Sequence, residues 1–524
     1  IPAYIPPELE PSTHLLILGM RYLKLRNYPL EKFEESADFM KSLSKFFAKT
    51  ENFPVCLAYA EVTNQLLLPL AGSLTAEVNH PTWVEAMSTL LNTAKRLQAD
   101  NKYWVSGFKL TVSILCASPP DLFSKQWLSL LEANASKVKS KSLNERIIFA
   151  VGLSRLVWVY LYRCPETLNN TTRTLTKLLQ LYLNTRKKEN WITGDFGLLN
   201  PLTDALISIG FLHPNFLMEQ ALIPLIRQSF NGSNLENINY EKLILTINTY
   251  KGLLVTKERP RFPEDDNRLY ELNLNNITVN QVQEASSINH TEISDYFYKL
   301  FLLLDSSIGS EVWSPENQHQ KQSSNAFSPF GFSFSNDNDS SKNKSLYVIL
   351  FGTIIEAIPC CLSISRTIPY KSTIEILSRN AVHSEVIISS SSQNALRALA
   401  SKKNPYTLIT WFAKYSFDFD EKTQSSYNMS YLSSKEYNRL LILYVELLEC
   451  WLEEFQSSNK EENKKETGLD GIRLLPIDAE QEESNETEKL EWKNTVTVIE
   501  EVEGNGLFFL CSHDAKIRRL GIQI

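Results

Sequence analysis

Apolar residues recur along the chain at helical spacing, in stretches of roughly 10 to 20 residues separated by short polar or proline-marked breaks. After an opening pair of helices, the first half is predicted to hold helices near 55–70, 81–97, 103–116, 122–138, 143–163, 175–183, 201–211, 214–230 and 240–255. The pattern resumes at 346–362, 373–377, 385–399, 405–415 and 439–455. Consecutive helices with short links pack as antiparallel neighbours, so we predict an all-α fold, a HEAT/armadillo-like α-solenoid of stacked helix pairs with polar insertions. No strict repeat consensus is present, which leaves an all-α bundle of several domains as the alternative.

The opening pair meets at a corner within residues 20–40. Residues 14–26 are apolar almost all round, which predicts a helix packed on more than one side. A residue before proline is pushed toward extended geometry, so a second helix is expected to begin at about Pro29. Its apolar positions are Phe33, Ala37, Met40, Leu43 and Phe47, widened by Phe39 and Phe46. They cover about half of its circumference, so this helix needs neighbours on two sides.

The most apolar segment, residues 147–161, predicts a core helix that is too short to cross a bilayer. It carries Arg155 near its middle, and this cation will need a buried acceptor or a path to solvent. Trp83, Trp104, Trp127 and Trp158 lie inside apolar patterns, so core packing is their expected role, with an interface anchor as the less frequent one.

We expect the chain to divide into five parts. Residues 1–256 form an N-terminal helical array, 257–345 a polar and largely flexible insert with a short helix near 293–304, and 346–456 further helical repeats. Residues 457–503 are predicted to form an acidic loop that docks on the surface, and 504–524 the start of another repeat with Ser512 as its N-cap. Ile1 is not an initiator methionine and Ile524 lies inside a helical pattern, so we expect a piece of a longer chain.

Composition supports this picture. Only 17 of 524 residues are glycine, about half the usual share, which argues against strand-rich folds with many tight turns. The net charge of −7 comes from residues 459–503, which hold 14 acidic and 6 basic side chains. The sequence has no basic stripe of the kind that would indicate a nucleic-acid partner. The seven cysteines are scattered without paired spacing, which is typical of buried, reduced thiols in a cytosolic protein.

Catalytic motifs are missing from the sequence. It contains no glycine-rich phosphate loop, kinase signature or HExxH, and its seven histidines never stand at metal-ligand spacing. The run from Cys511 to Asp514 places nucleophile, base and acid types side by side, but adjacent residues at a helix start point in different directions. Basic clusters at 137–141 and 186–188 could contact anionic lipid or an acidic partner, although solvated surface is the commoner role. We predict no catalytic, cofactor-binding or metal residues, no cofactor, no small-molecule ligand and no transmembrane segment, and the sequence names no partner-binding residue.

Several motifs resemble one known family, the Furry or cell-morphogenesis proteins. The similar segments are MRYLKLRNYPLEKFEES at 20–36, LLLPL at 66–70 with EVN at 77–79, LSRLVWVY at 153–160, and YEK at 240–242. Their order and separations fit residues 11–255 well, while from 346 onward the resemblance rests mainly on IRRL at 517–520. The long Asn/Ser-rich insert is most similar to that of fungal members.

The resemblance implies a helical scaffold without catalytic activity that works with an NDR-family kinase and its Mob coactivator. In fungi this is the RAM or MOR network of polarised growth, cell separation and cell shape, which implies a cytoplasmic location at the cortex and at growth sites. Two alternatives remain open at this point. One is a helical-repeat adaptor in transport or membrane trafficking, and the other is an enzyme whose site is assembled from distant residues in a deep pocket.

Overall fold

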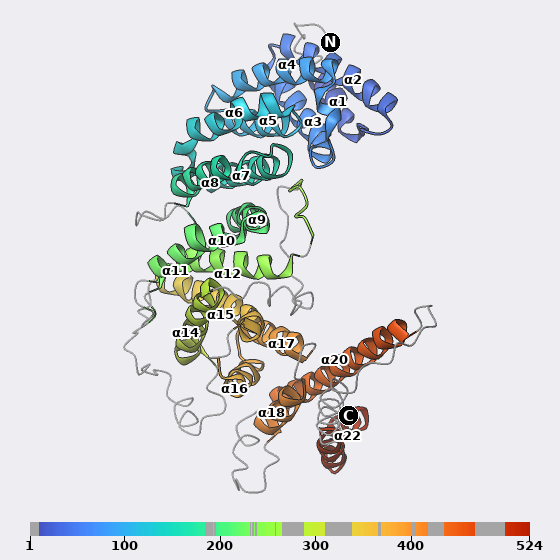
Figure 1. Cartoon of the computed structure of the whole chain (residues 1–524), viewed down its shortest axis with the longest axis vertical. Coiled ribbons are helices and arrows are strands. Elements are labelled where there is room, and N and C mark those ends of the chain that lie inside the picture. Colours follow the sequence, from blue (N-terminus) through green and yellow to red (C-terminus); the bar gives the residue numbers. More distant parts are fainter. Residues whose placement is uncertain are drawn as a thin grey trace, which may run out of the picture. The chain divides into compact units, whose positions relative to one another are not determined.

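The fold consists of helices throughout the part of the chain that is described (Figure 1). This computed structural model describes residues 10–183, 192, 195–230, 232, 235, 238–256, 258–264, 288–309, 338–364, 368–400, 405–417, 434–466 and 498–524. Two compact units are present, one made of Ile1–Gln228 with Glu241–Leu272 and the other of Ser229–Tyr240 with Asn273–Ile524.

The first unit is a stack in which helices two apart in sequence pack on each other. Its elements are α1 (Glu10–Gly19), η2 (Met20–Tyr22), α2 (Leu30–Lys49), α3 (Phe53–Ala71), η3 (Ala76–Asn79), α4 (Pro81–Gln98), α5 (Trp104–Cys116), α6 (Pro120–Ala133), η4 (Ala135–Lys139), α7 (Leu143–Arg163), α8 (Leu168–Tyr182), α9 (Phe196–Leu212), α10 (Pro214–Leu217), η5 (Met218–Leu222), α11 (Ile223–Ser229) and α12 (Tyr240–Val255). Helices α1, α3, α5, α7 and α9 form one row of packed neighbours, and α2 packs on α4. This alternation is the packing expected of stacked helix pairs, and it confirms the predicted fold class.

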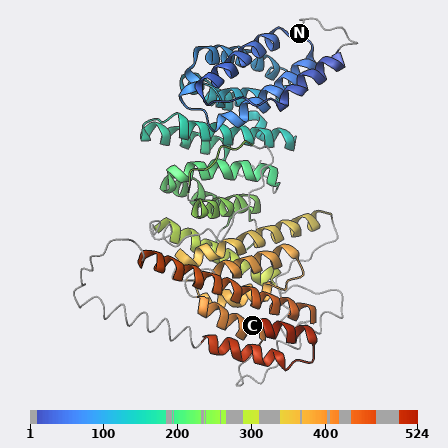
Figure 2. The ribbon, with the colours of Figure 1, turned by 90° about the vertical axis from the view of Figure 1, so that its right-hand side faces the viewer.

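The second unit is also built of packed helices, of which α15 and α20 are the longest. Its elements are α14 (Ile288–Ile308), α15 (Asn338–Ile364), α16 (Tyr370–Asn380), α17 (Val386–Ala400), α18 (Pro405–Phe417), α20 (Ser434–Glu466), a helical segment at 498–510, and α22 (Ala515–Gln523). Figure 2 shows α15, α17 and α20 lying one beside the next, and the packing of α15 on α17 and of α17 on α20 agrees with this view.

The corner at residues 20–40 differs from its prediction in the first helix and agrees with it in the second. Helix α1 ends at Gly19 and its continuation at Tyr22, and the chain then runs without helix to Pro29. The Ser36 hydroxyl holds Arg26, accepting from its N–H at 3.0 Å and donating to its carbonyl at 3.1 Å. The expectation of a helix packed on several sides is wrong, because Leu15 and Leu16 are 68% and 70% exposed.

The second helix of the corner is buried as its pattern predicts. It begins at Leu30, one residue after Pro29, and its five apolar positions Phe33, Ala37, Met40, Leu43 and Phe47 are all buried. Phe33 lies against Trp83 of α4, with ring centroids 5.2 Å apart, and Phe47 stacks on Tyr59 of α3 at 5.3 Å. This helix therefore joins its neighbours on two sides.

Several helix ends lie beyond the apolar pattern that predicted them. Helix α15 starts at Asn338, inside the predicted insert, and α20 continues to Glu466, inside the predicted acidic loop. The end of α20 is rich in Glu and Lys, which have high helix propensity and prolong a helix once its apolar part is packed, so hydrophobic periodicity underestimates its length. The N-cap of α22 is Asp514, which accepts from Lys516 N, and the Ser512 hydroxyl accepts from Asp514 N at 3.2 Å. The prediction of Ser512 as the cap is therefore wrong by two residues.

The cysteines agree with the expectation of reduced thiols. All seven are free, and Cys56, Cys116, Cys164, Cys360 and Cys361 are buried, whereas Cys450 is half-buried and Cys511 exposed. Burial raises the pKa of the Cys116 thiol to about 12, which keeps it protonated and unreactive at neutral pH.

Candidate functional site

Helix α7 is the most enclosed element of the first unit. Every residue from 148 to 161 is buried, because α5, α6, α9 and η4 pack around the helix and residues 258–264 cover part of what remains. We call residues 258–264 the strap. A helix buried on all sides offers no water to a charged side chain, so Arg155 has to find its acceptors within the protein.

The strap supplies those acceptors through its main chain. Arg155, 1% exposed, donates from Nε to the Pro263 carbonyl at 2.8 Å and from Nη2 to the Glu264 carbonyl at 2.5 Å. One helical turn further, Trp158 donates its indole N–H to the Pro260 carbonyl at 2.8 Å. Of the two outcomes expected for Arg155, a buried acceptor or a path to solvent, the structure shows the first, and the acceptor lies 108 residues along the chain.

Ring and cation contacts add to these hydrogen bonds. The Arg259 guanidinium lies 4.6 Å from the ring centroid of Trp158 and 4.5 Å from that of Tyr162. Phe262 is buried, meets Trp158 edge to face at 5.3 Å, and lies so close to Gly72 at the end of α3 that a Cβ there would approach it to 2.9 Å. Burial raises the pKa of Tyr162, so its ring stays neutral beneath the guanidinium. The strap lies at the start of the insert that was predicted to be polar and largely flexible, and it is packed on α7.

The carboxyl end of α7 ties three helices together. The Arg163 guanidinium donates to the Cys116 carbonyl, to the Ser118 carbonyl at 3.1 Å and to the Ala71 carbonyl at 3.4 Å. These carbonyls belong to the ends of α5 and α3, where the helix dipole and unpaired acceptors favour a cation. Burial lowers the pKa of Arg163 from its ordinary value, although the guanidinium remains charged near neutral pH.

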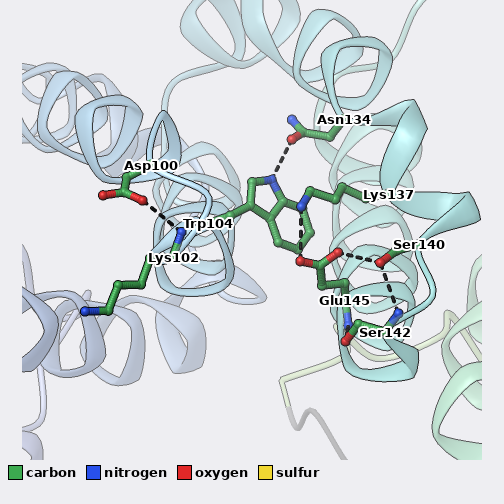
Figure 3. Close-up of polar contacts among 8 residues, drawn as sticks. All are labelled: Asp100, Lys102, Trp104, Asn134, Lys137, Ser140, Ser142 and Glu145. Carbon is green, nitrogen blue, oxygen red and sulfur yellow. Dashed lines mark hydrogen bonds and ion pairs between the residues drawn. The ribbon is translucent and has the colours of Figure 1, made fainter.

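The amino end of α7 is held by a polar cluster, shown in Figure 3. Trp104 donates its indole N–H to Asn134 Oδ1 at 2.7 Å, and the Lys137 ammonium lies 4.6 Å from the centroid of the same indole. Lys137 also forms a 3.0 Å ion pair with Glu145 in the first turn of α7. This lysine of the predicted basic cluster 137–141 is therefore an internal contact, while cluster 186–188 lies outside the described residues.

Two serines complete the cluster at this helix start. Ser140 donates its hydroxyl to Glu145 at 2.6 Å and accepts from Ser142 N at 3.1 Å, and Ser142 is the N-cap of α7 (Figure 3). The Ser140 hydroxyl bond, together with the Lys137 ammonium, holds the pKa of Glu145 below its usual range. In the loop before Trp104, Asp100 accepts from Lys102 N at 2.8 Å.

The four tryptophans singled out from the sequence are all core residues. Trp83, Trp104, Trp127 and Trp158 are buried, and Trp83 donates to the Ala117 carbonyl at 2.8 Å. The predicted core role is confirmed, and Trp158 additionally contacts the strap. The isolated arginine in an apolar helix was the one sequence signal that pointed to this site.

A cavity of about 240 Å³ lies between α5 and α7 and is lined in part by Arg155. Its lining includes Phe108, Lys109 and Val112 from α5, and Asn144, Ile147 and Arg155 from α7. Among the described residues, no three His, Cys, Asp or Glu side chains come close enough together to hold a metal ion. The helices in the described ranges also include none with the length and apolar character needed to cross a membrane.

Comparison with known proteins gives a consistent result. A family model described as "Cell morphogenesis N-terminal" matches residues 1–452. The Cell polarity protein mor2 of Schizosaccharomyces pombe (strain 972 / ATCC 24843) is 30% identical over 259 residues, which make up 49% of this chain and 11% of that protein. The chain thus matches about a tenth of the length of this relative. Among solved structures, the crystal structure of an engineered protein aligns over 98% of this chain and 97% of its own at 10% identity, with a TM-score of 0.29 that is too low to bear on the fold.

Proposed function

The chain belongs to the cell morphogenesis family, and from this membership we propose that it is a non-catalytic scaffold in the control of cell shape and polarity. The match of the family model across residues 1–452 is the observation that carries the proposal. The similarity to a protein named for cell polarity also supports a role in cell polarity, over the part of that relative that the chain covers.

The construction of the first unit suits a scaffold. Stacked helices expose long continuous surfaces to partners, and their stability comes from contacts between neighbouring helices. The charged groups around α7 are committed to such contacts: Arg163 joins the ends of α3 and α5, and Lys137 with Glu145 fixes the start of α7. These side chains hold the surface in shape and do not converge on one reacting atom.

The partners we propose are an NDR-family kinase with its Mob coactivator and further components of the RAM or MOR network. This assignment rests on the family resemblance of the motifs at 20–36, 66–70 and 153–160. We accordingly place the protein in the cytoplasm, at the cortex and at sites of polarised growth.

Imaging in cells that carry the gene tests this function. The protein is tagged at its own locus, and the variants Phe33→Ala and Phe46→Ala are compared with the wild type for cell shape and tag position. Phe33 is buried and Phe46 half exposed, so the first variant should give rounded or misdirected growth while the second grows normally. Enrichment of the tag at nuclear pores or vesicles, with normal cell shape in both variants, would contradict the proposal and favour a trafficking adaptor.

A further inference from the structure

The contacts that hold the strap on α7 are of the kind that hold a bound peptide on a protein surface. All three hydrogen bonds from Arg155 and Trp158 reach main-chain carbonyls of the strap. Main-chain carbonyls are common to every sequence, so these donors recognise a non-helical backbone and not one particular side chain. Prolines at 260 and 263 favour that backbone, because each fixes its own φ and lowers the entropy lost on docking.

Two side chains of the strap supply selectivity. Arg259 places its guanidinium over the rings of Trp158 and Tyr162, and Phe262 is buried between Trp158 and Gly72. The two are three residues apart and each precedes a proline, so the strap presents the order Arg-Pro-x-Phe-Pro to α7. Recognition of proline-containing segments by aromatic-lined grooves follows the same physical rule.

We propose that the face of α7 formed by Arg155, Trp158 and Tyr162 is a peptide-binding site, which the strap occupies within the chain. The ligand in trans is a non-helical segment of another protein with a cation, an aromatic ring and prolines in the order of the strap.

The strap competes with such a ligand because it is part of the same chain and is therefore present at a high effective concentration. It starts three residues after α12 ends at Val255, and a short tether of this kind gives an effective concentration of about 1 mM. A peptide that binds the open site with a Kd of about 0.1 mM would then bind the wild-type chain about tenfold more weakly. Weakening the contacts between the strap and α7 should therefore increase the affinity of the chain for a peptide.

The test measures binding of a fluorescein-labelled peptide with the sequence of residues 256–267 to the 524-residue chain by fluorescence anisotropy. The strap is released by Arg259→Ala with Phe262→Ala, two changes that leave its backbone and the α7 face intact. We expect the released chain to bind the peptide about tenfold more tightly than the wild type does. A control peptide with both positions changed to Ala should lose this binding.

A third change shows whether the peptide uses the α7 face. Adding Trp158→Phe to the released chain removes the donor to the Pro260 carbonyl and reduces the ring area that contacts the arginine and the phenylalanine of the peptide, so binding should weaken about fivefold or more. If the released chain does not fold by circular dichroism, Arg259→Ala alone replaces it, because that side chain is exposed. Equal binding to wild-type and released chains, no binding to either, or indifference to Trp158→Phe would overturn the proposal and make the strap a fixed part of the fold.

Discussion

Replacing Phe33 with Ala tests how the amino-terminal corner is held together. The Phe33 side chain is 0% exposed and lies between α2 and α4, with its ring 5.2 Å from Trp83 and edge to face with His80 at 6.2 Å. Truncation removes the apolar burial of the ring and leaves a cavity that Trp83 cannot fill, because the indole is fixed by its bond to the Ala117 carbonyl. We expect a loss of about 3 to 5 kcal/mol in the free energy of unfolding.

Phe46 in the same helix provides the matched control. Its side chain is 48% exposed, so Phe46→Ala makes the same chemical change where no cavity forms, and the loss should stay at about 1 kcal/mol or less. For a unit of this size, each kcal/mol lowers Tm by about 2 to 4 °C, so Phe33→Ala should lower the first melting transition by about 6 to 20 °C.

Thermal and urea unfolding followed by circular dichroism at 222 nm measure both variants. Stacked helices unfold with their neighbours, so the loss should appear in the transition that contains α2 and α4. Equal shifts for the two variants, or a larger shift for Phe46→Ala, would refute the assignment of Phe33 to the core. Loss of partner binding in Phe33→Ala without any loss of stability would instead make the corner an interface.

Three further outcomes follow from the packing and the buried charges. Arg163→Met should lower the free energy of unfolding by about 2 to 4 kcal/mol in urea titrations, because the carbonyls at the ends of α3 and α5 lose their charged donor, and Arg163→Lys should recover part of the loss. Gly107→Ala should lower the free energy of unfolding by about 1 to 3 kcal/mol, since the added Cβ would lie 2.5 Å from the backbone N of Gln98. At Gly19 an added Cβ has no neighbour within 4 Å, so Gly19→Ala should be neutral or slightly stabilising in the same urea titrations. Burial lowers the pKa of His290 from 6.5 to about 4, so between these pH values the folded chain holds the imidazole neutral while the unfolded chain binds a proton. The contribution of His290 to stability should therefore be complete above pH 6.5 and be lost as the pH falls from 6.5 to about 4. Unfolding curves at pH 7, 5.5 and 4 should show this slope, and His290→Gln should flatten it.

The sequence was sufficient wherever local periodicity decides the structure. Residues 143–163 and 240–255 were predicted as helices and are α7 and α12 with the same bounds. The buried face of α2 also follows directly from its 3.6-residue pattern, since a helix with an apolar stripe must bury it. Arg155 predicted that polar groups of another segment would contact α7, because an unpaired cation inside a core costs too much free energy.

What the sequence could not supply depends on contacts between distant residues. The acceptors of Arg155 lie in the strap, more than a hundred residues away, and no local pattern links the two. The apolar residues of α1 look like a core helix, yet Leu15 and Leu16 are exposed, because burial is decided by which helices stack on α1 and not by its composition. The predicted division into five parts remains a prediction, although two of its boundaries fall inside α15 and α20.

Binding to a purified kinase–Mob complex tests the proposed scaffold role. The 524-residue chain is immobilised and titrated with an NDR-family kinase bound to its Mob coactivator. We expect saturable binding that a catalytically inactive kinase reproduces, because a scaffold binds the folded complex and takes no part in its chemistry. Failure of the chain to bind the kinase–Mob complex would contradict the proposed role.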